Sequence, residues 1–412
     1  MIFFANVEIM DNSLCTAIAT NNFMLLEQLI NDNPNQIKAA KFSLSSLINS
    51  DYNKNNFVLS LDDLTLMHIA AFVNSTECAI LLYSKGFSFS MPNARGHKPF
   101  HYACYGGAYE MVNLILSEDK DGVEELFQKD YSDSEARRIN LPYLAALSGS
   151  YEILNCLFEN GYNYDKYTSN QYKTLGINHT INTKNIECLK IFLKYIKPTK
   201  TYAQHTPLMQ AVINNQTQAI VLLLETDCMI KQMTDKFETA LSLACLNENE
   251  DAVRLIADKI IDDIDIPKDK KAPGATHWAC YSCNPHIVEI ILNRDININR
   301  FDQHGHTGPY YLLDRGTEDN TIRILEMYVK RGYDINLHDK NKNTIFGEFL
   351  IAIKKCYKIY EWFLSHGADT SCYLYTKTRD KQTIGAYMRT LARFDKRMKN
   401  LVTRFNITRT EE

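Results

Sequence analysis

The chain has 412 residues, of which 45% are hydrophobic and 23% charged, and its formal net charge is −4 at pH 7. These values are ordinary for a soluble folded protein. No apolar run approaches the ~20 residues that cross a bilayer, and the opening segment, MIFFANVEIM, lacks the basic residues of a secretory signal. We therefore expect an intracellular protein, in the cytoplasm or alternatively the nucleus, and neither a membrane-spanning nor a secreted one.

Alanines recur through the chain at intervals of 33, 42, 66, 33 and 35 residues, which indicates a repeat close to 33 residues with one insertion and one double interval. They are Ala70, Ala103, Ala145, Ala211, Ala244 and Ala279. Each lies in similar local sequence, such as TLMHIAA at 65–71 and TALSLAC at 239–245, and an apolar pair follows it eleven residues later. A fixed period of this length predicts stacked units, because no single unit can bury its own apolar face.

The residue types in the repeat suit a pair of short helices. Alanine lets the first helix lie close against its neighbours, where a larger side chain would separate them. The apolar pair faces inward from a second helix. Threonine before proline, as at Thr206-Pro207, caps the start of the first helix.

With these motifs the chain resembles the ankyrin repeat family, whose units open with Thr-Pro-Leu-His and end near Gly-Ala-Asp. The matching residues are His68, His101 and His277 at the family's histidine, Thr206-Pro207-Leu208 at the opening, Gly367-Ala368-Asp369 at the ending, and Gly107 and Gly149 at the bend between helices. At other bends Asn74, Asn215 and Glu248 replace glycine, which marks the repeats as diverged. The resemblance covers roughly residues 12–369. It implies an all-α ankyrin-repeat solenoid of about nine or ten stacked helix-turn-helix units with short connecting turns.

In chain order, we expect an N-terminal cap with a first degenerate repeat at 1–40, an insertion at 41–62, the ankyrin repeat array at 63–369 and a basic C-terminal capping helix region at 370–412. Weaker units at 12–30, 173–194, 307–336 and 344–369 complete the series. A second insertion, at 119–138, lies inside the array. Insertions in solenoids emerge from one face as loops, and these are either tolerated surface loops, which we favour, or recognition loops.

Eleven cysteines occur in the chain, and Cys104, Cys245 and Cys280 share one position of the repeat. Free cysteine behaves as a small buried apolar residue. The pattern therefore predicts reduced, buried thiols in a reducing compartment rather than a disulfide framework.

His277, Cys280, Cys283 and His286 form an HxxCxxCxxH string whose residue types suit zinc. Their places in the repeat argue against a metal site, since the string would run from the start of one helix to the start of the next and could not close one coordination shell. We predict no metal and no cofactor. The motifs GxSxG, GxxxxGK[ST], GxGxxG and HExxH do not occur, so we also predict no enzymatic activity.

Residues 373–412 contain ten Lys or Arg and four Asp or Glu, a net charge of +6, so that the residues before them carry −10. Apolar residues recur at helical spacing between Ile384 and Phe405, with basic residues largely between them. The pattern predicts a basic amphipathic helix that caps the array. The alternative is that this helix docks on an acidic partner, either a membrane surface or nucleic acid.

Function is expected on the exposed side of the stack. Stacked repeats curve, and the concave side presents the turn tips and the outward face of the first helices. By resemblance to the family, these positions contact protein partners. The candidates are Phe72, Asn93, Arg95, His97, Tyr105, Lys236, Phe237, Leu246, Tyr281, Gln303, His304, His306, Lys340 and Asn341.

We therefore predict a monomeric, non-enzymatic scaffold or adaptor that binds a protein partner through this surface. The sequence does not identify the partner, because ankyrin arrays bind unrelated targets and a fold does not fix a function. One alternative is an adaptor with a second, acidic partner on the basic C-terminal helix. The other is a microbial effector with a cryptic catalytic insertion.

Overall fold

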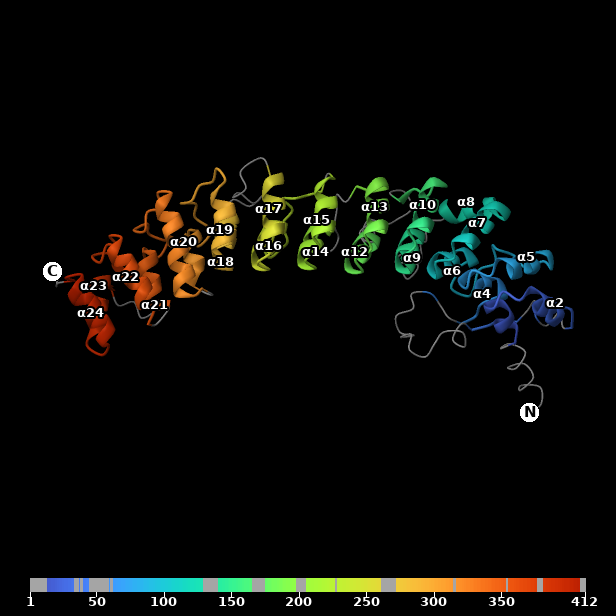
Figure 1. Cartoon of the computed structure of the whole chain (residues 1–412), viewed down its shortest axis with the longest axis horizontal. Coiled ribbons are helices and arrows are strands. Elements are labelled where there is room, and N and C mark those ends of the chain that lie inside the picture. The colour runs from blue at the N-terminus through green and yellow to red at the C-terminus, as the bar shows by residue number, and fades with distance from the viewer. Residues whose placement is uncertain are drawn as a thin grey trace. The chain divides into compact units, whose positions relative to one another are not determined.

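The computed structural model describes residues 13–32, 37, 40–43, 59, 62–128, 140–164, 175–197, 205–226, 228–260, 272–313, 316–352, 355–375 and 381–407. The chain divides into two compact units, Met1–Ala203 and Gln204–Glu412, and each is described by itself. Both consist of short helices in antiparallel pairs, which confirms the predicted all-α array (Figure 1). No helix in these described ranges is long and apolar enough to cross a membrane.

The first unit contains a layer of first helices and a layer of second helices. Its elements are α2 Phe23–Asp32, α4 Leu66–Phe72 with α5 Thr76–Ser84, α6 Pro99–Gly106 with α7 Tyr109–Glu118, α8 Lys120–Gln128, α9 Leu141–Ser148 with α10 Tyr151–Glu159, and α12 Leu175–Asn182 with α13 Ile186–Tyr195. The first helices α4, α6, α9 and α12 pack in series, and so do the second helices α5, α7, α10 and α13.

The second unit repeats this arrangement. Its elements are α14 Pro207–Ile213 with α15 Thr217–Leu224, α16 Ala240–Leu246 with α17 Glu250–Lys259, α18 Ala275–Ser282 with α19 Pro285–Leu292, the 3-10 helix η5 Gly308–Leu313 with α20 Glu318–Lys330, α21 Ile345–Ala352 with α22 Tyr357–Ser365, the antiparallel strands β1 Tyr373–Tyr375 and β2 Lys381–Thr383, and α23 Ile384–Ala392 with α24 Lys396–Arg404. Its first helices pack in the order α14, α16, α18, η5 and α21, and its second helices in the order α15, α17, α19, α20, α22 and α24.

The recurring alanine occupies the contact between helices, as its small size predicts. Ala70 and Ala103 are fully buried, and each carbonyl accepts a 2.9 Å hydrogen bond from the backbone N–H five residues later. Thr180 makes the same bond to Asn185 N, also at 2.9 Å, and is fully buried. Thr180 is therefore the missing member of the series in the double interval between Ala145 and Ala211.

The bends between paired helices use the left-handed backbone region. Gly107 and Gly149 have φ of 72° and 78°, and the substitutes Asn74, Asn215 and Glu248 have φ of 59°, 54° and 53°. Non-glycine residues adopt this region at some cost in free energy. The structure thus confirms that these residues hold the bends that glycine would otherwise hold.

Toward the C-terminus the packing residue becomes larger. Five residues after the threonines Thr307, Thr344 and Thr383, the alanine position is taken by Leu312, Phe349 and Met388, all buried. This substitution explains why the alanine series ends at Ala279 while the helix pairs continue.

The basic C-terminal segment differs from its prediction as one capping helix. It forms the β1–β2 hairpin followed by the two helices α23 and α24, which pack on each other. Asp395 ends the first helical run, because its side chain accepts hydrogen bonds from Arg397 N at 2.8 Å and Met398 N at 3.0 Å and so caps a new helix. Residues 376–380 and 408–412 lie outside the described residues.

The two predicted insertions are only partly described. Most of 41–62 and all of 129–138 lie outside the described residues. The described part of the second insertion is α8, which packs on α7 and buries Val123, Leu126 and Phe127. This part is therefore a packed helix rather than a loop.

Candidate interaction surface

In the described parts of the chain, four turns that precede first helices share one hydrogen-bonded form. In each, the N–H of the first residue donates to the carbonyl of the fifth at 2.9 Å, for the pairs Asn93 and His97, Thr234 and Glu238, Asp302 and His306, and Asp339 and Asn343. The side chain of the first residue also accepts from backbone N–H groups inside the turn, as Asp302 Oδ1 does from His304 N at 2.7 Å and His306 N at 2.9 Å. These tips are fixed by their own hydrogen bonds.

The first described tip presents only one of its three candidate residues. Asn93 and His97 are each 5% exposed, whereas Arg95 is exposed. The Asn93 amide donates to Tyr102 Oη at 3.0 Å, so it holds the turn against α6. Burial lowers the pKa of His97 to about 4, and the ring is therefore neutral. We leave Asn93 and His97 out of the proposed surface because a partner could not reach their side chains.

The family's histidine joins the start of a first helix to the next turn tip. His277 Nδ1 accepts from Gly274 N at 3.1 Å, and its Nε2 lies 3.0 Å from the carbonyl of His306. His68 makes the equivalent contacts with Thr65 N at 3.2 Å and the His97 carbonyl at 3.0 Å. Burial lowers the pKa of both rings to about 4. These histidines are neutral connectors between repeats.

The HxxCxxCxxH string does not come together. Both ring nitrogens of His277 face backbone groups, Cys280 Sγ lies 3.2 Å from Tyr328 Oη, Cys283 forms the bend with φ of 53°, and His286 is exposed on α19. Throughout the described residues, no group of three or more His, Cys, Asp or Glu side chains is placed to hold a metal ion.

Three half-buried aromatic side chains, Trp278, Tyr281 and Tyr311, lie together on the first helices of the second unit, and we call them the aromatic patch. Their ring centroids are 6.0 Å apart for Trp278 and Tyr281, 6.4 Å for Trp278 and Tyr311, and 6.4 Å for Tyr281 and Tyr311. The two pairs that include Tyr281 are edge-to-face, with planes at 78° and 72°, and the third pair is tilted at 58°.

Hydrogen bonds tie the aromatic patch to the neighbouring turn tips. Tyr311 Oη donates to Asp302 Oδ2 at 2.8 Å, in the tip that carries the exposed Gln303 and His304. Lys340, in the next tip, donates from Nζ to the Gln303 carbonyl. The patch and the two tips therefore form one connected surface.

His306, the last residue of the first of these two tips, contacts the second tip. Its ring stacks on Tyr310 at 4.9 Å between centroids, and its Nε2 lies 3.7 Å from the buried Asp339 carboxylate. The nearby Asp339 carboxylate raises the pKa of His306, against the opposing effect of its partial burial. The half-buried ring is thus held by a stack and an ion pair when protonated.

The other candidates lie apart from the aromatic patch. Phe72 and Tyr105, in the first unit, are half-buried with ring centroids 6.1 Å apart. In the second unit Phe237 and Leu246 are half-buried, and Lys236 is exposed. Asn341 is exposed on the tip that carries Lys340.

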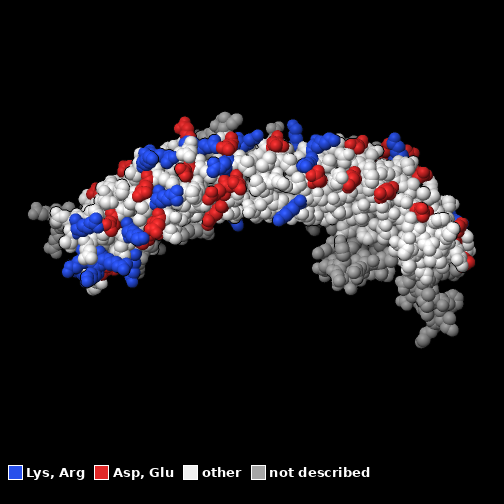
Figure 2. All heavy atoms as spheres, in the orientation of Figure 1, with Lys and Arg blue, Asp and Glu red and all other residues white. Residues whose placement is uncertain are grey.

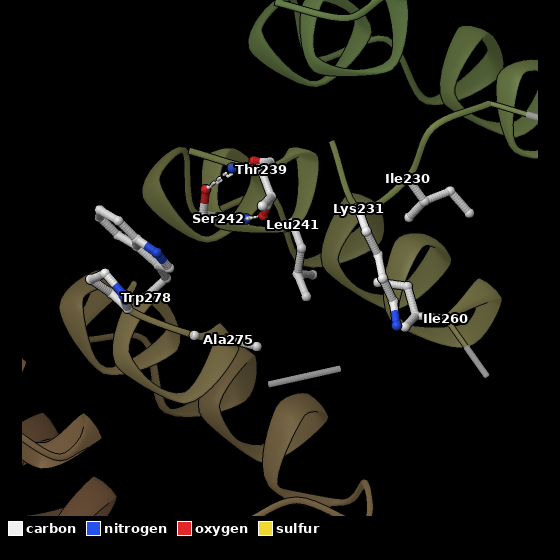
Figure 3. A pocket seen from close by; sticks show the side chains of 10 residues that line it. Ile230, Lys231, Thr239, Leu241, Ser242, Ile260, Ala275 and Trp278 are labelled. Carbon is white, nitrogen blue, oxygen red and sulfur yellow. Dashed lines mark hydrogen bonds between the residues drawn. The ribbon is translucent and has the colours of Figure 1, made fainter. Parts of the chain in front are cut away.

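A pocket opens beside the aromatic patch. Trp278 lines one side of it, and Lys231 and Ile260 lie opposite (Figure 3). The hydroxyl groups of Thr239 and Ser242 in its wall are satisfied by the cap of α16, through bonds of 2.7 Å and 3.1 Å. The buried indole Nε1 of Trp278 has no hydrogen-bond partner among the described residues. A bound carbonyl could accept a hydrogen bond from this donor.

The sequence matches the family model for ankyrin repeats in three copies, over residues 10–125, 143–233 and 227–302, together well over half of the chain. The chain belongs to the ankyrin repeat family. Ankyrin repeats are in general protein-interaction scaffolds and are in general non-enzymatic.

Two comparisons with known proteins accompany the family match. The chain is 25% identical over 194 residues to the Caenorhabditis elegans homolog of transient receptor potential cation channel subfamily A member 1, which covers 47% of this chain and only 15% of that protein. Among solved structures it is similar to the ankyrin repeat domain of Bcl-3, with a TM-score of 0.39 and 14% identity, over 65% of this chain and 98% of that one.

Sequence reasoning identified Tyr281 of the aromatic patch but missed Trp278 and Tyr311. These two residues share one ankyrin position, directly before the packing residues Ala279 and Leu312. On the first helices, the prediction considered only the position two residues after the recurring alanine. Examining the preceding position in the same register would have found both.

Proposed function

We propose that this ankyrin array is a scaffold without chemistry of its own, which binds a protein partner through the aromatic patch and the adjoining turn tips. The contact among Trp278, Tyr281 and Tyr311 carries this proposal. Tryptophan and tyrosine are the residue types that most often dominate binding energy at interfaces. A rigid aromatic cluster also loses little side-chain freedom on binding.

Polar groups around the aromatic patch supply specificity in this proposal. The tip residues Gln303, His304, Lys340 and Asn341 are exposed, and the hydrogen bonds within the tips hold their backbone in place. A partner that lies along the tips would place apolar side chains on the patch and polar groups over the tips. Arg95, Phe72, Tyr105, Lys236, Phe237 and Leu246 provide further proposed contacts.

The state of the cysteines supports a role without catalysis. None of the eleven forms a disulfide in the described structure, and burial raises the pKa of Cys188 and Cys245 to about 12. A nucleophilic cysteine needs a lowered pKa and access to solvent. We propose that the chain works as a monomer in a reducing intracellular compartment, where these thiols persist.

The test compares two double variants of the full chain. Tyr281→Ala with Tyr311→Ala truncates the aromatic patch. Tyr109→Ala with Tyr151→Ala removes two tyrosines that are 39% and 44% exposed on second helices and serves as the matched control. Partners are captured from native lysate, quantified by mass spectrometry and then purified for a direct affinity measurement.

We expect the patch variant to bind the purified partner at least about tenfold more weakly, since interface aromatic residues often contribute more than ~1 kcal/mol each. The control variant should bind like the wild type, and circular dichroism should show both variants folded. Equal loss in both variants, or retention by the patch variant, would contradict the proposed surface.

A further inference from the structure

The described residues 381–407 are strongly basic, with seven Lys or Arg and a single acidic residue, Asp395. Figure 2 shows the resulting concentration of basic side chains at the end of the second unit, where α24 lies in Figure 1. The helices α23 and α24 pack on each other and bury Met388, Met398 and Leu401. The cations therefore lie on the outside of a packed helix pair.

Some charges of this segment have structural partners. Arg404 forms an ion pair with Glu361 on α22, and the Arg397 guanidinium lies over the Tyr357 ring, 5.5 Å from its centroid. Asp395 accepts from the Tyr357 hydroxyl in addition to its cap bonds, and these hydrogen bonds, the Tyr357 bond foremost, lower its pKa. These contacts stabilise the packing of α24 on α22.

The turn between α23 and α24 presents a different set of basic side chains. Arg393, Lys396 and Lys399 are exposed, with no ion-pair partner in the part of the chain that the structure describes. Between them Phe394 is 89% exposed, the highest value among the exposed large hydrophobic residues described. We call these four residues the basic tip. An exposed apolar ring thus lies among three cations that have no ion-pair partner within the described residues.

We propose that the basic tip docks on an anionic lipid surface. Clusters of Lys and Arg on amphipathic helices bind acidic headgroups through their charge, and an aromatic ring beside them enters the boundary between headgroups and acyl chains. A single ring at a turn suits this boundary, whereas single-stranded nucleic acid needs several stacking rings along a charged groove. The inference goes beyond protein binding and is independent of the aromatic patch.

The first test measures sedimentation of the full chain with vesicles of phosphatidylcholine alone and of equal parts phosphatidylcholine and phosphatidylserine. We expect binding to the mixed vesicles only, weakening as salt rises. Lys396→Gln with Lys399→Gln should lower the affinity about fivefold for each lysine. Lys259→Gln with Lys330→Gln changes the net charge equally at exposed positions of α17 and α20 and should leave the affinity unchanged.

The second test measures whether the Phe394 side chain enters the lipid surface. Phe394→Trp should give a blue-shifted emission on mixed vesicles after subtraction of the wild-type signal from Trp278 and Trp362, and Phe394→Ala should weaken binding that remains at high salt. The proposal is overturned if the emission does not shift, or if the two lysine pairs have equal effects. It is also overturned if a single-stranded oligonucleotide binds the chain while mixed vesicles do not.

Discussion

Buried histidines link repeats in this chain, and they make its stability depend on pH. The folded pKa of His68 and of His277 is about 4 because burial disfavours the charged ring. The ordinary value in an unfolded chain is about 6.5. As the pH falls, the unfolded chain therefore takes up protons first. The stability that each neutral ring preserves is complete above about pH 6.5 and is lost progressively toward pH 4.

We predict that acidification from pH 7 to pH 5 lowers the free energy of unfolding by about 2 kcal/mol for each such histidine. His277→Gln removes one of these titrations. The variant should be less stable at pH 7, because it loses a connecting hydrogen bond, but its further loss on acidification should be smaller by about 2 kcal/mol. Urea unfolding followed by the fluorescence of Trp278 and Trp362 measures both values, and equal losses in variant and wild type would contradict the assignment.

His306 contributes to the pH dependence of stability with the opposite sign. Its folded pKa is raised by Asp339, so its contribution to stability is complete below the unfolded value and is lost as the pH rises through the folded value. At mildly acidic pH this ion pair opposes the effect of the buried histidines. Asp339→Asn should therefore make the acid-induced loss of stability in the second unit larger than in the wild type, measured by the same urea titrations.

Phe237 is a turn residue with a backbone conformation that its side chain disfavours. Phe237 has φ of 63°, at the place where Gly96 and Gly305 have φ of 81° and 82° in equivalent turns. The left-handed region costs a non-glycine residue ~1–2 kcal/mol, and glycine loses ~0.5–1 kcal/mol more backbone entropy on folding. We expect Phe237→Gly to leave stability unchanged or raise it by up to ~1 kcal/mol.

Lys342→Gly is the matched control for that change, because Lys342 has φ of 65° in its own turn. It should shift the urea midpoint in the same direction. If Phe237→Gly instead destabilises the protein by more than ~1 kcal/mol, side-chain packing at this tip outweighs the backbone term.

At the scale of elements, the alanine period predicted most helix pairs because the spacing of neighbouring repeats is set by one small buried residue. The alanine period did not mark the repeats in which another residue takes this position, which are those of Thr180 and Leu312. The C-terminal pair was predicted as one helix because Met388, Leu391, Met398 and Leu401 continue the apolar spacing across the break. Only Asp395, as the cap of α24, marks that break.

The surface was harder to predict than the stack for a physical reason. A packed position tolerates few side chains and so repeats, whereas an outward position such as Trp278 is under no such constraint. The buried Asn93 shows that a turn tip contains both exposed residues and the side chains that fix the turn.

Close contact between first helices gives a prediction at this scale. A Cβ atom built on Gly106 in α6 would lie 2.1 Å from the backbone oxygen of Phe72 in α4. Backbone atoms cannot move aside by changing a rotamer, so Gly106→Ala must separate the two helices. Overpacking costs ~1–3 kcal/mol and exceeds the ~1 kcal/mol that alanine gains in helix propensity.

We therefore expect Gly106→Ala to lower the free energy of unfolding of the first unit by up to about 2 kcal/mol. Ser148→Ala changes the corresponding position of α9, where a Cβ is already accommodated, and should cost less than about 1 kcal/mol for its hydrogen bond to the Ala145 carbonyl. Amide hydrogen exchange should show faster opening of α4 and α6 in the glycine variant. Unchanged exchange there would mean that the helices separate without cost.

Across the whole molecule, cysteines report on how the array opens. Eight are buried and three, Cys228, Cys356 and Cys372, are intermediate in exposure. Repeats contact only their neighbours, so arrays open locally as well as globally. A buried thiol therefore reacts only as fast as its own repeats open.

We predict that a thiol reagent labels at most three cysteines promptly in the native protein and eleven in urea without prior reduction. Labelling at Cys372 should be slow even so, because burial raises its pKa to about 11 and leaves little thiolate near neutral pH. Mass spectrometry of labelled peptides over time gives the order in which the eight buried sites open. Since Cys104 and Cys245 share one repeat position in different units, a difference in their rates measures the local stability of those repeats rather than a difference in chemistry. Fewer than eleven thiols in urea would show a disulfide and contradict the reduced state assigned to every cysteine.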